Sequence, residues 1–275
     1  MNGKTVLVTG ATDGIGKMTA TGLAKKDATV ILHGRNKLLG GEIAEQIKKE
    51  TGNLNVFYEN ADLTSLGNVS KLANTVTQKY GSLDVLINNA GVFMRGQTFS
   101  AEGIETTFAV NHLAHFALTL QLLPLLLRSP QGRVVTVSSV AHTSSPRIDF
   151  SDLQEINSYI DYSAYALSKL ANVLFSNELA HLLKESSVTS NSLHPGVITT
   201  KLLYAGFGIS GSPLEEGART SVYLASEPAL ENTNGRYFSN SKEAEPSPYS
   251  YDPGTRKNLW DLSEELSGLK FSDFA

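Results

Sequence analysis

The chain has 275 residues and no cysteine, and its 23 lysines and arginines are balanced by 27 aspartates and glutamates. The lack of cysteine excludes a disulfide scaffold, a cysteine-ligated metal and a thiol nucleophile. The formal net charge is −4, with no basic cluster long enough to follow a phosphate backbone. A nucleic-acid partner is therefore not expected.

Short apolar runs rich in β-branched residues alternate along the chain with longer stretches of helical periodicity. The predicted strands are residues 5–9, 28–33, 56–58, 83–88, 133–138, 189–194 and 235–238. The predicted helices are residues 15–26, 37–50, 66–80, 108–127, 162–183, 213–226 and 256–269. Apolar strands that are each followed by a helix indicate a parallel sheet covered on both faces. We therefore predict an α/β fold, a single-domain doubly wound (Rossmann) parallel sheet of about seven strands, with ligands at the carboxyl ends of the strands.

The first predicted strand begins within a few residues of Met1, and the longest apolar stretch elsewhere, residues 116–127, contains Pro124. A helix that crosses a bilayer needs about 20 apolar residues. We therefore expect residues 116–127 to form a buried helix, and we expect a soluble, cytoplasmic protein without a targeting segment or a membrane span.

A glycine-rich turn joins the first predicted strand to the first predicted helix. Glycine leaves backbone N–H groups open to a ligand, and the start of a helix favours phosphate. Three glycines alone can be a simple turn, but this position is the one that a dinucleotide-binding motif requires. The candidate pyrophosphate-binding residues are Gly10, Thr12, Asp13, Gly14, Ile15 and Gly16.

The end of the second strand bears on the choice between NAD and NADP. An acidic side chain here would bind the ribose 2′-hydroxyl, whereas a 2′-phosphate needs a cation. The chain reads His33-Gly34-Arg35-Asn36-Lys37, without a carboxylate. Arg35 can stack on adenine and pair with the phosphate, with Asn36 beside it, so NADP(H) is favoured. Alternatively, Arg35 and Lys37 only cap a solvated helix start, and the nearby negative charge of Asp13 opposes a phosphate.

Two further strand ends carry candidate cofactor contacts. Asn89, Ala90 and Gly91 follow the fourth strand. Their amide and small side chains suit hydrogen bonds between neighbouring strand ends and a close passage of the cofactor. After the sixth strand, an open backbone from Pro195 to Thr200 could bind the nicotinamide carboxamide.

Tyr165 and Lys169 are four residues apart on a predicted helix and therefore share one face. A free tyrosine has a pKa of about 10, and a neighbouring cation together with a positive nicotinamide ring should lower the pKa of Tyr165. The Tyr-x-x-x-Lys pattern alone is weak in a chain with ten tyrosines. Its support comes from Ser139, which ends the fifth strand, and from Asn111, which lies early in the long helix after the fourth.

These motifs together resemble the short-chain dehydrogenase/reductase superfamily, and the resemblance extends from Lys4 to about Phe238. Within the superfamily the chain is most similar to the retinol-dehydrogenase-like branch. The supporting strings are VNHLAHF from Val110, VSSVAH from Val137, YALSKLAN from Tyr165 and HPG from His194.

The resemblance implies an NADP(H)-dependent carbonyl reductase or alcohol dehydrogenase that moves a hydride. In it, Tyr165 transfers the proton, Ser139 polarises the substrate oxygen, and Lys169 binds the nicotinamide ribose and tunes Tyr165. Asn111 would hold a water in a proton relay. Asp62 and Leu63 would contact the adenine, with Asp62 alternatively capping the next helix. The residues implied at the nicotinamide are Pro195, Gly196, Ile198 and Thr200.

The long segment between Ser139 and Tyr165 predicts an apolar lid and hence an apolar or aromatic carbonyl or alcohol substrate. Its candidate lining residues are Ile148, Phe150, Leu153, Tyr159 and Tyr162. Residues 1–240 are expected to form the dinucleotide-binding catalytic domain, with a C-terminal tail over 241–275 whose short helix packs on it. The family resemblance implies a homodimer or homotetramer.

Other interpretations stay open at this point. The same fold could serve as a catalytically silent nicotinamide-binding sensor, or as an enzyme acting on a double bond or a nucleotide-sugar. No metal is expected, because no carboxylate completes a ligand set with the helix residues His112 and His115. These histidines, and His142, are expected in packing or polar networks.

Overall fold

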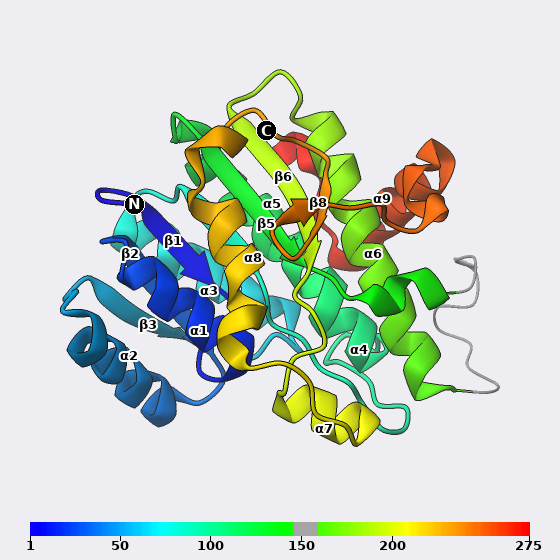
Figure 1. Ribbon diagram of the computed structural model, residues 1–275. Coiled ribbons are helices and arrows are strands. Elements are labelled where there is room, and N and C mark those ends of the chain that lie inside the picture. The colour runs from blue at the N-terminus through cyan, green and yellow to red at the C-terminus, as the bar shows by residue number, and fades with distance from the viewer. Residues whose placement is uncertain (146–158) are drawn as a thin grey trace.

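The computed structural model describes residues 1–145 and 159–275. Strands and helices alternate through most of the chain (Figure 1). The strands are β1 (Thr5–Val8), β2 (Thr29–Gly34), β3 (Val56–Asn60), β4 (Val85–Asn88), β5 (Gly132–Val137), β6 (Val188–His194), β7 (Tyr237–Ser239) and β8 (Lys242–Glu243). The helices are α1 (Gly14–Ala24), α2 (Lys37–Thr51), α3 (Leu66–Tyr80), α4 (Thr106–Phe108), α5 (Ala114–Arg128), α6 (Asp161–Leu182), α7 (Lys201–Phe207), α8 (Leu214–Ser226) and α9 (Pro253–Ser267).

The strands form one sheet in the order β3-β2-β1-β4-β5-β6-β7-β8. Each neighbouring pair from β3 to β7 is parallel, and only the two-residue β8 runs antiparallel, beside β7. The chain order reverses between β1 and β4, which is the switch point where doubly wound sheets bind ligands. The predicted doubly wound α/β fold is therefore confirmed. The extra strand β8 lies in a tail that has no apolar run to reveal it.

The alternation of side chains along the strands gives the protein two apolar layers. Leu7 and Ile31 pack into a buried cluster with α3, α5 and α6, whereas Val8 and Leu32 pack into a second cluster with α1, α2 and α8. In Figure 1, α1 and α8 accordingly lie on the near face of the sheet, and α3 and α5 on the far face. Both faces are covered, because adjacent residues of a strand point to opposite sides.

One long helical run, Thr106–Arg128, passes through α4, a π-helical turn at Ala109–Leu113 and α5. Among the described residues it is the one helix that is long and apolar enough to cross a membrane, by length and composition alone. In the fold, 83% of its apolar window is buried. The predicted helix at residues 108–127 and its burial therefore agree with the structure, in which the helical run begins two residues earlier and ends one residue later.

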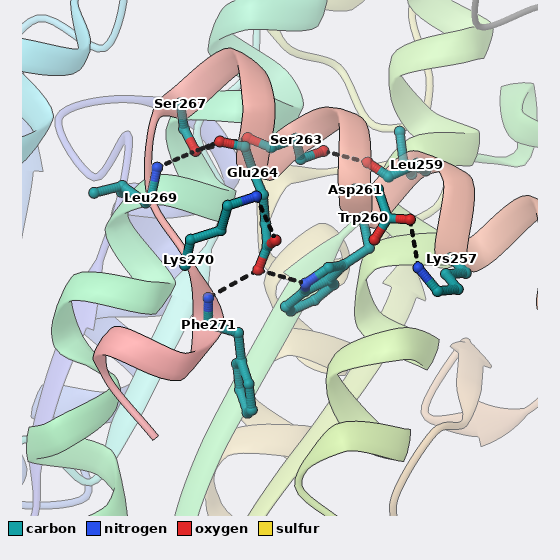
Figure 2. A network of polar contacts seen from close by, with 10 residues as sticks. All are labelled: Lys257, Leu259, Trp260, Asp261, Ser263, Glu264, Ser267, Leu269, Lys270 and Phe271. Carbon is teal, nitrogen blue, oxygen red and sulfur yellow. Dashed lines mark hydrogen bonds and ion pairs between the residues drawn. The ribbon is translucent and has the colours of Figure 1, made fainter.

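The C-terminal helix α9 packs against α5 and α6 through one aromatic side chain. Trp260 stacks on Phe175 of α6 with ring centroids 6.0 Å apart, and it meets Phe116 of α5 edge-on at 5.0 Å. Glu264 holds the end of the helix: its Oε1 accepts hydrogen bonds from Trp260 Nε1 at 3.3 Å and from the Phe271 amide at 2.8 Å (Figure 2). These contacts fix the end of the chain to the helical layer behind the sheet.

Candidate active site

A cleft of about 630 Å³ opens at the carboxyl ends of the parallel strands. Nearly all the predicted site residues line it, together with residues that follow β5 and β6. Those of the sequence-predicted set are Gly10, Thr12, Asp13, Gly14, Ile15, Gly16, Arg35, Asp62, Leu63, Asn89, Ala90, Gly91, Ser139, Tyr165, Lys169, Pro195, Gly196, Ile198 and Thr200. Asn36 and Asn111 are the two exceptions. One concave site therefore holds both predicted ends, cofactor and catalytic.

The glycine-rich turn between β1 and α1 needs glycine for two different reasons. Gly10 has φ of +64°, a conformation that other residues rarely adopt. A Cβ on Gly16 would lie 2.2 Å from the Gly10 carbonyl oxygen and 2.4 Å from Asn89 Nδ2. Asp13 caps α1 by accepting a hydrogen bond from the Gly14 amide at 2.9 Å. The turn thus brings open backbone and a helix start to the cleft, which suits a pyrophosphate.

Replacing Gly16 by alanine is expected to push the turn away from β4. Overpacking of this kind costs about 1–3 kcal/mol of stability, and we expect dinucleotide binding to weaken by about tenfold or more, equivalent to ~1.4 kcal/mol. Urea unfolding and titration with NADPH measure both effects. Gly41→Ala is the control, because Gly41 is exposed in helix α2 and a Cβ there would have no other atom within 4 Å. This variant should be slightly more stable than the parent. Equal behaviour of the two variants would contradict the close-packed turn.

Hydrogen bonds tie the ends of β1 and β4 together below the cleft. The Thr9 hydroxyl accepts hydrogen bonds from the amides of Asn89 and Ala90, each at 2.9 Å. Asn89 Nδ2 donates to the Thr9 carbonyl at 2.8 Å, and His115 Nε2 lies 2.9 Å from the Thr9 hydroxyl. The predicted polar role of His115 is thus seen directly. These bonds hold the ends of β1 and β4 together at the switch point. A cofactor could therefore lie directly against this part of the cleft.

The side of the cleft next to β2 contains one exposed cation. Arg35 lines the cleft, and no ion pair within residues 1–145 and 159–275 uses its side chain. Asn36 instead caps α2, its Oδ1 accepting from the Leu39 amide at 3.1 Å, and for this reason it lies outside the lining. Asp62 Oδ1 accepts from the Thr64 amide at 3.0 Å, whereas the residue that precedes α3 is Ser65. The alternative in which Asp62 caps the next helix is therefore wrong.

Lys201, which the sequence analysis did not single out, changes the charge of this region. Its Nζ lies 2.7 Å from Asp13 Oδ2, so that α7 is joined to the glycine-rich turn across the cleft. Partial burial is the largest single influence on the Asp13 carboxyl and raises its pKa. Lys201 and the Gly14 amide together outweigh it, so the pKa of Asp13 is lowered overall. The negative charge that opposed a phosphate ligand is therefore paired.

Helix α6 presents Tyr165 and Lys169 to the same part of the cleft, as their spacing predicts. Lys169 Nζ lies 5.6 Å from the centre of the Tyr165 ring and donates to the Val137 carbonyl oxygen at 3.2 Å. Both side chains are buried, at 6% and 3% exposed. Ser139 follows β5 and lines the same cleft, and its hydroxyl acts to lower the pKa of the Tyr165 phenol. A phenol, a hydroxyl and an ammonium thus meet at one end of the cleft.

The sequence predicts that Lys169 together with a bound nicotinamide lowers the pKa of Tyr165. Among the protein's own groups the direction is the opposite, and the effect of the nicotinamide stays a prediction. Burial raises the pKa of Tyr165 to about 12, although the Ser139 hydroxyl acts in the opposite direction. Burial also lowers the pKa of Lys169 to about 8. Both shifts have the same physical cause, since a charged form is costly in a site with little water. The phenol therefore holds its proton at neutral pH, as a proton donor must.

Asn111 lies in the π-helical turn behind the cleft, with no exposed surface. Its Oδ1 accepts from the Val92 amide at 2.8 Å, and its Nδ2 donates to the Val92 carbonyl and the Ser168 hydroxyl, each at 3.0 Å. The side-chain amide is thus used to hold the segment after β4 against α6. The predicted role in holding a water stays a prediction.

Residues after β6 line the cleft next to the glycine-rich turn, where a Cβ on Gly14 would lie 3.6 Å from the Thr200 side chain. Gly196 has φ of +99°, and Ile198 is buried. Thr200 caps α7, its hydroxyl accepting from the Leu203 amide at 3.0 Å. The predicted open stretch is only partly open, because the Val197 carbonyl and the Thr199 amide pair with the backbone of Ser212 at 2.8 and 3.0 Å. It leads directly into the short helix α7.

Helix α7 is the largest feature of the site that the sequence analysis missed. It contains no fully buried residue, but Leu202, Leu203 and Phe207 line the cleft. Phe207 lies with its ring centroid 6.1 Å from that of Tyr165 and 5.1 Å from that of Phe93. Tyr162 also lines the cleft, as predicted, whereas Tyr159 donates to Glu105 Oε1 at 3.1 Å. Ile148, Phe150 and Leu153 lie outside the described residues.

The remaining histidines are placed in networks. His112 Nε2 lies 2.8 Å from the Ser263 hydroxyl of α9, and burial lowers its pKa to about 3. Within residues 1–145 and 159–275, no group of three or more histidines, aspartates or glutamates is arranged to hold a metal ion.

A doubly wound sheet with a glycine-rich turn at its switch point, and a buried tyrosine and lysine beside it, defines a dinucleotide-binding oxidoreductase. The family model described as short chain dehydrogenase matches residues 4–205. Human retinol dehydrogenase 14 is 39% identical, over 98% of this chain and 88% of its own length. The chain belongs to the short chain dehydrogenase family, in its retinol-dehydrogenase-like branch, which confirms the resemblance seen in the sequence.

Solved structures agree with this assignment. A protein from Mycobacterium paratuberculosis has a TM-score of 0.83 and 34% identity, with 98% of this chain and 95% of that chain covered. A short chain dehydrogenase from Escherichia coli, solved in complex with NADPH, has a TM-score of 0.73 and 28% identity, with 88% and 98% covered.

Proposed function

We propose that this protein is an NADP(H)-dependent carbonyl reductase or alcohol dehydrogenase for apolar or aromatic substrates. The observation that carries the proposal is the buried Tyr165 phenol, which lines the cleft together with Ser139 and has the Lys169 ammonium 5.6 Å from its ring. This is the set that a proton transfer to a carbonyl oxygen needs, since it combines a donor, an orienting hydroxyl and a nearby cation.

The cleft fits a dinucleotide by the shape of its backbone. The turn at Gly10 and Gly16 has no room for a Cβ, and it presents the start of α1 to the cleft. Arg35 lies at the end of β2, where a 2′-phosphate would be bound. The NADPH complex of the Escherichia coli relative supports this choice of cofactor.

When bound, a nicotinamide cofactor would supply or accept the hydride. Ser139 orients the substrate oxygen toward the Tyr165 hydroxyl, which donates its proton in the reducing direction and takes it back in the oxidising direction. The high pKa of Tyr165 suits the reducing direction, because the proton is present throughout neutral pH. Lys169, protonated below its pKa of about 8, stabilises the phenolate that remains after transfer.

The substrate side of the cleft supports an apolar or aromatic substrate. Phe207, Phe93 and Tyr162 form an aromatic group around Tyr165, with ring centroids 5.1 to 6.1 Å apart. Phe207 and Tyr162 line the cleft itself. Apolar walls favour apolar ligands, because these lose little hydration free energy when they leave water. A small polar ketone would gain less from this end of the cleft.

The proposal is tested by following cofactor absorbance over a panel of aldehydes, ketones and alcohols, with NADPH and NADH in parallel. We expect turnover with NADPH above NADH, and faster turnover of aromatic and long-chain carbonyls than of small polar ketones. Silence across the panel, with NADPH still bound, would contradict the catalytic assignment and favour a sensor. Fastest turnover of small polar ketones would reject the proposed substrate class.

Arg35→Glu is expected to reverse the cofactor preference. The new carboxylate repels a 2′-phosphate and can accept from a ribose 2′-hydroxyl, so kcat/KM with NADPH should fall by about 10- to 100-fold while that with NADH rises. Lys37→Glu makes the same change of charge two residues away, at an exposed position outside the cleft. It should leave the NADPH/NADH ratio within about twofold. Equal losses in both variants would show a general charge effect and no recognition by Arg35.

A further inference from the structure

His142 lies directly behind Ser139, in a short 3₁₀ turn at Val140–Ser144, and is 1% exposed. Its Nδ1 lies 2.6 Å from the Ser139 carbonyl oxygen, and its Nε2 lies 2.9 Å from the amide nitrogen of Ser247 in the C-terminal tail. The His142 imidazole therefore joins the backbone of Ser139 to the C-terminal tail, which is more than a hundred residues away in sequence.

The two partners fix the protonation of this ring. A backbone amide can only donate, so Nε2 of His142 accepts from Ser247, and the proton of the neutral ring lies on Nδ1. Nδ1 then donates to the Ser139 carbonyl oxygen. Burial lowers the pKa of His142, which favours this neutral form. The ring is therefore a directed link, with a donor toward Ser139 and an acceptor toward the tail.

The tail end of the link is itself fixed. Ser247 and Ser250 are buried, and the Ser250 hydroxyl donates to the Ser247 carbonyl at 2.6 Å. Asn177 Nδ2 of α6 donates to the Ser250 carbonyl at 3.1 Å. The His142 ring also packs on Tyr237 of β7, with centroids 5.0 Å apart. The tail is thus anchored to the same helix that carries Tyr165 and to the sheet.

The Ser139 peptide is held from both sides. Its carbonyl oxygen accepts from the His142 amide at 3.1 Å in addition to Nδ1, and its hydroxyl accepts from the Ala141 amide at 3.2 Å. On the other side, the Val140 amide donates to His194 Nδ1 at 3.2 Å. Because the Nδ1 bond is the shortest of these contacts, its loss should let the backbone of Ser139 rotate, and the hydroxyl would then move relative to the Tyr165 phenol.

We propose that His142 is a positioning residue for the reaction, which fixes the Ser139 hydroxyl against Tyr165 and draws its own orientation from the C-terminal tail at Ser247. The inference rests on the proposed function, because it concerns the geometry of that site. His142 does not line the cleft, so its effect is on the chemical step and not on cofactor binding.

Two variants separate the two halves of the link. In His142→Asn the side-chain NH₂ occupies roughly the place of Nδ1, so the donor to Ser139 is kept and the acceptor for Ser247 is lost. In His142→Gln the side-chain oxygen reaches the place of Nε2, so the acceptor is kept and the donor is lost. We expect kcat to fall by about tenfold or more in His142→Gln and by less than about threefold in His142→Asn, with the dissociation constant of NADPH unchanged in both.

Further readouts distinguish positioning from simple stability. The Ser139 hydroxyl favours the ionised phenol, so the pH at which the oxidising reaction gains activity should move upward in His142→Gln only. Hydrogen exchange tests the link without turnover: the Ala141 amide should exchange faster in His142→Gln, and the Ser247 amide faster in His142→Asn.

The inference is overturned if His142→Gln turns over at the parent rate, or if the Ala141 amide exchanges equally in both variants. Losses of kcat that follow only the unfolded fraction of each variant, without the pH shift, would also overturn it. A parent protein that turns over no substrate would end the proposed function instead, and the exchange pattern would still decide whether His142 holds Ser139.

Discussion

Tyr165→Phe is expected to bind NADPH as the parent does and to reduce its substrates about 10² to 10⁴ times more slowly, which is the range that a positioned proton donor contributes. The variant removes one oxygen from a buried ring and leaves the ring contacts with Phe93 and Phe207 in place. The Ser139 hydroxyl keeps its hydrogen bond from the Ala141 amide. The loss should therefore appear in kcat and not in the stability of the fold.

Tyr162→Phe is the matched control, since Tyr162 lines the same cleft and also packs on Phe207, with centroids 6.0 Å apart. Its turnover should remain within about threefold of the parent. Stopped-flow reduction under single-turnover conditions isolates the chemical step from product release. Parent-like single-turnover rates in Tyr165→Phe would mean that another group delivers the proton, and the assignment of the site would have to be given up.

The local parts of this site could be predicted because residue type alone decides them. The positive φ of Gly10 and the missing Cβ of Gly16 are required wherever a strand turns tightly into a helix beside a neighbouring strand. Tyr165 and Lys169 share a helix face by spacing. Asn89 and Ser139 then meet these residues because the carboxyl ends of parallel strands lie at one edge of the sheet.

The parts that could not be predicted depend on which partner a side chain finds in three dimensions. Asn36 and Asn111 have amides that suit a ligand equally well, but one caps α2 and the other binds the Val92 backbone. Helix α7 has only seven residues, which is too short a segment for a helical period to be recognised in the sequence. Burial raises the pKa of Tyr165. The spacing of Tyr165 and Lys169 on a helix does not reveal how deeply the phenol is buried, so the neighbouring lysine suggested a shift in the opposite direction.

Buried and half-buried histidines make the second large prediction, which concerns acid stability. Burial lowers the pKa to about 4 for His33 and His194 and to about 3 for His112 and His115. Unfolded histidines have a pKa of about 6.5. Between these values the unfolded chain binds protons that the folded protein does not, so stability is complete above about pH 6.5 and falls as the pH decreases toward 4.

The size of the effect follows from the number of these four groups, and His142, whose pKa burial also lowers, adds to it in the same direction. Near pH 5 each of the four histidines is protonated when unfolded and neutral when folded, so unfolding takes up roughly four protons and the free energy of unfolding should fall by ~5 kcal/mol per pH unit. The carboxyls of Asp13 and Asp84 also have lowered pKa values. The stability that these two carboxyls contribute is lost only at lower pH, below the ordinary carboxyl range. The effect of the histidines and the effect of the carboxyls can therefore be told apart in a pH titration.

Urea unfolding followed by circular dichroism at several pH values between 4.5 and 7.5 gives this slope. His112→Gln should reduce it by about one proton, because glutamine can still reach the Ser263 hydroxyl that His112 contacts at 2.8 Å but does not titrate. Some stability at pH 7.5 will be lost with the ring contacts to Phe108 and Phe175, and that loss should shrink as the pH falls. A free energy of unfolding that stays level from pH 7 to pH 5 would show that these histidines can take up protons in the folded state, and the burial of the network around Thr9 and Asn111 would have to be less complete than the structure describes.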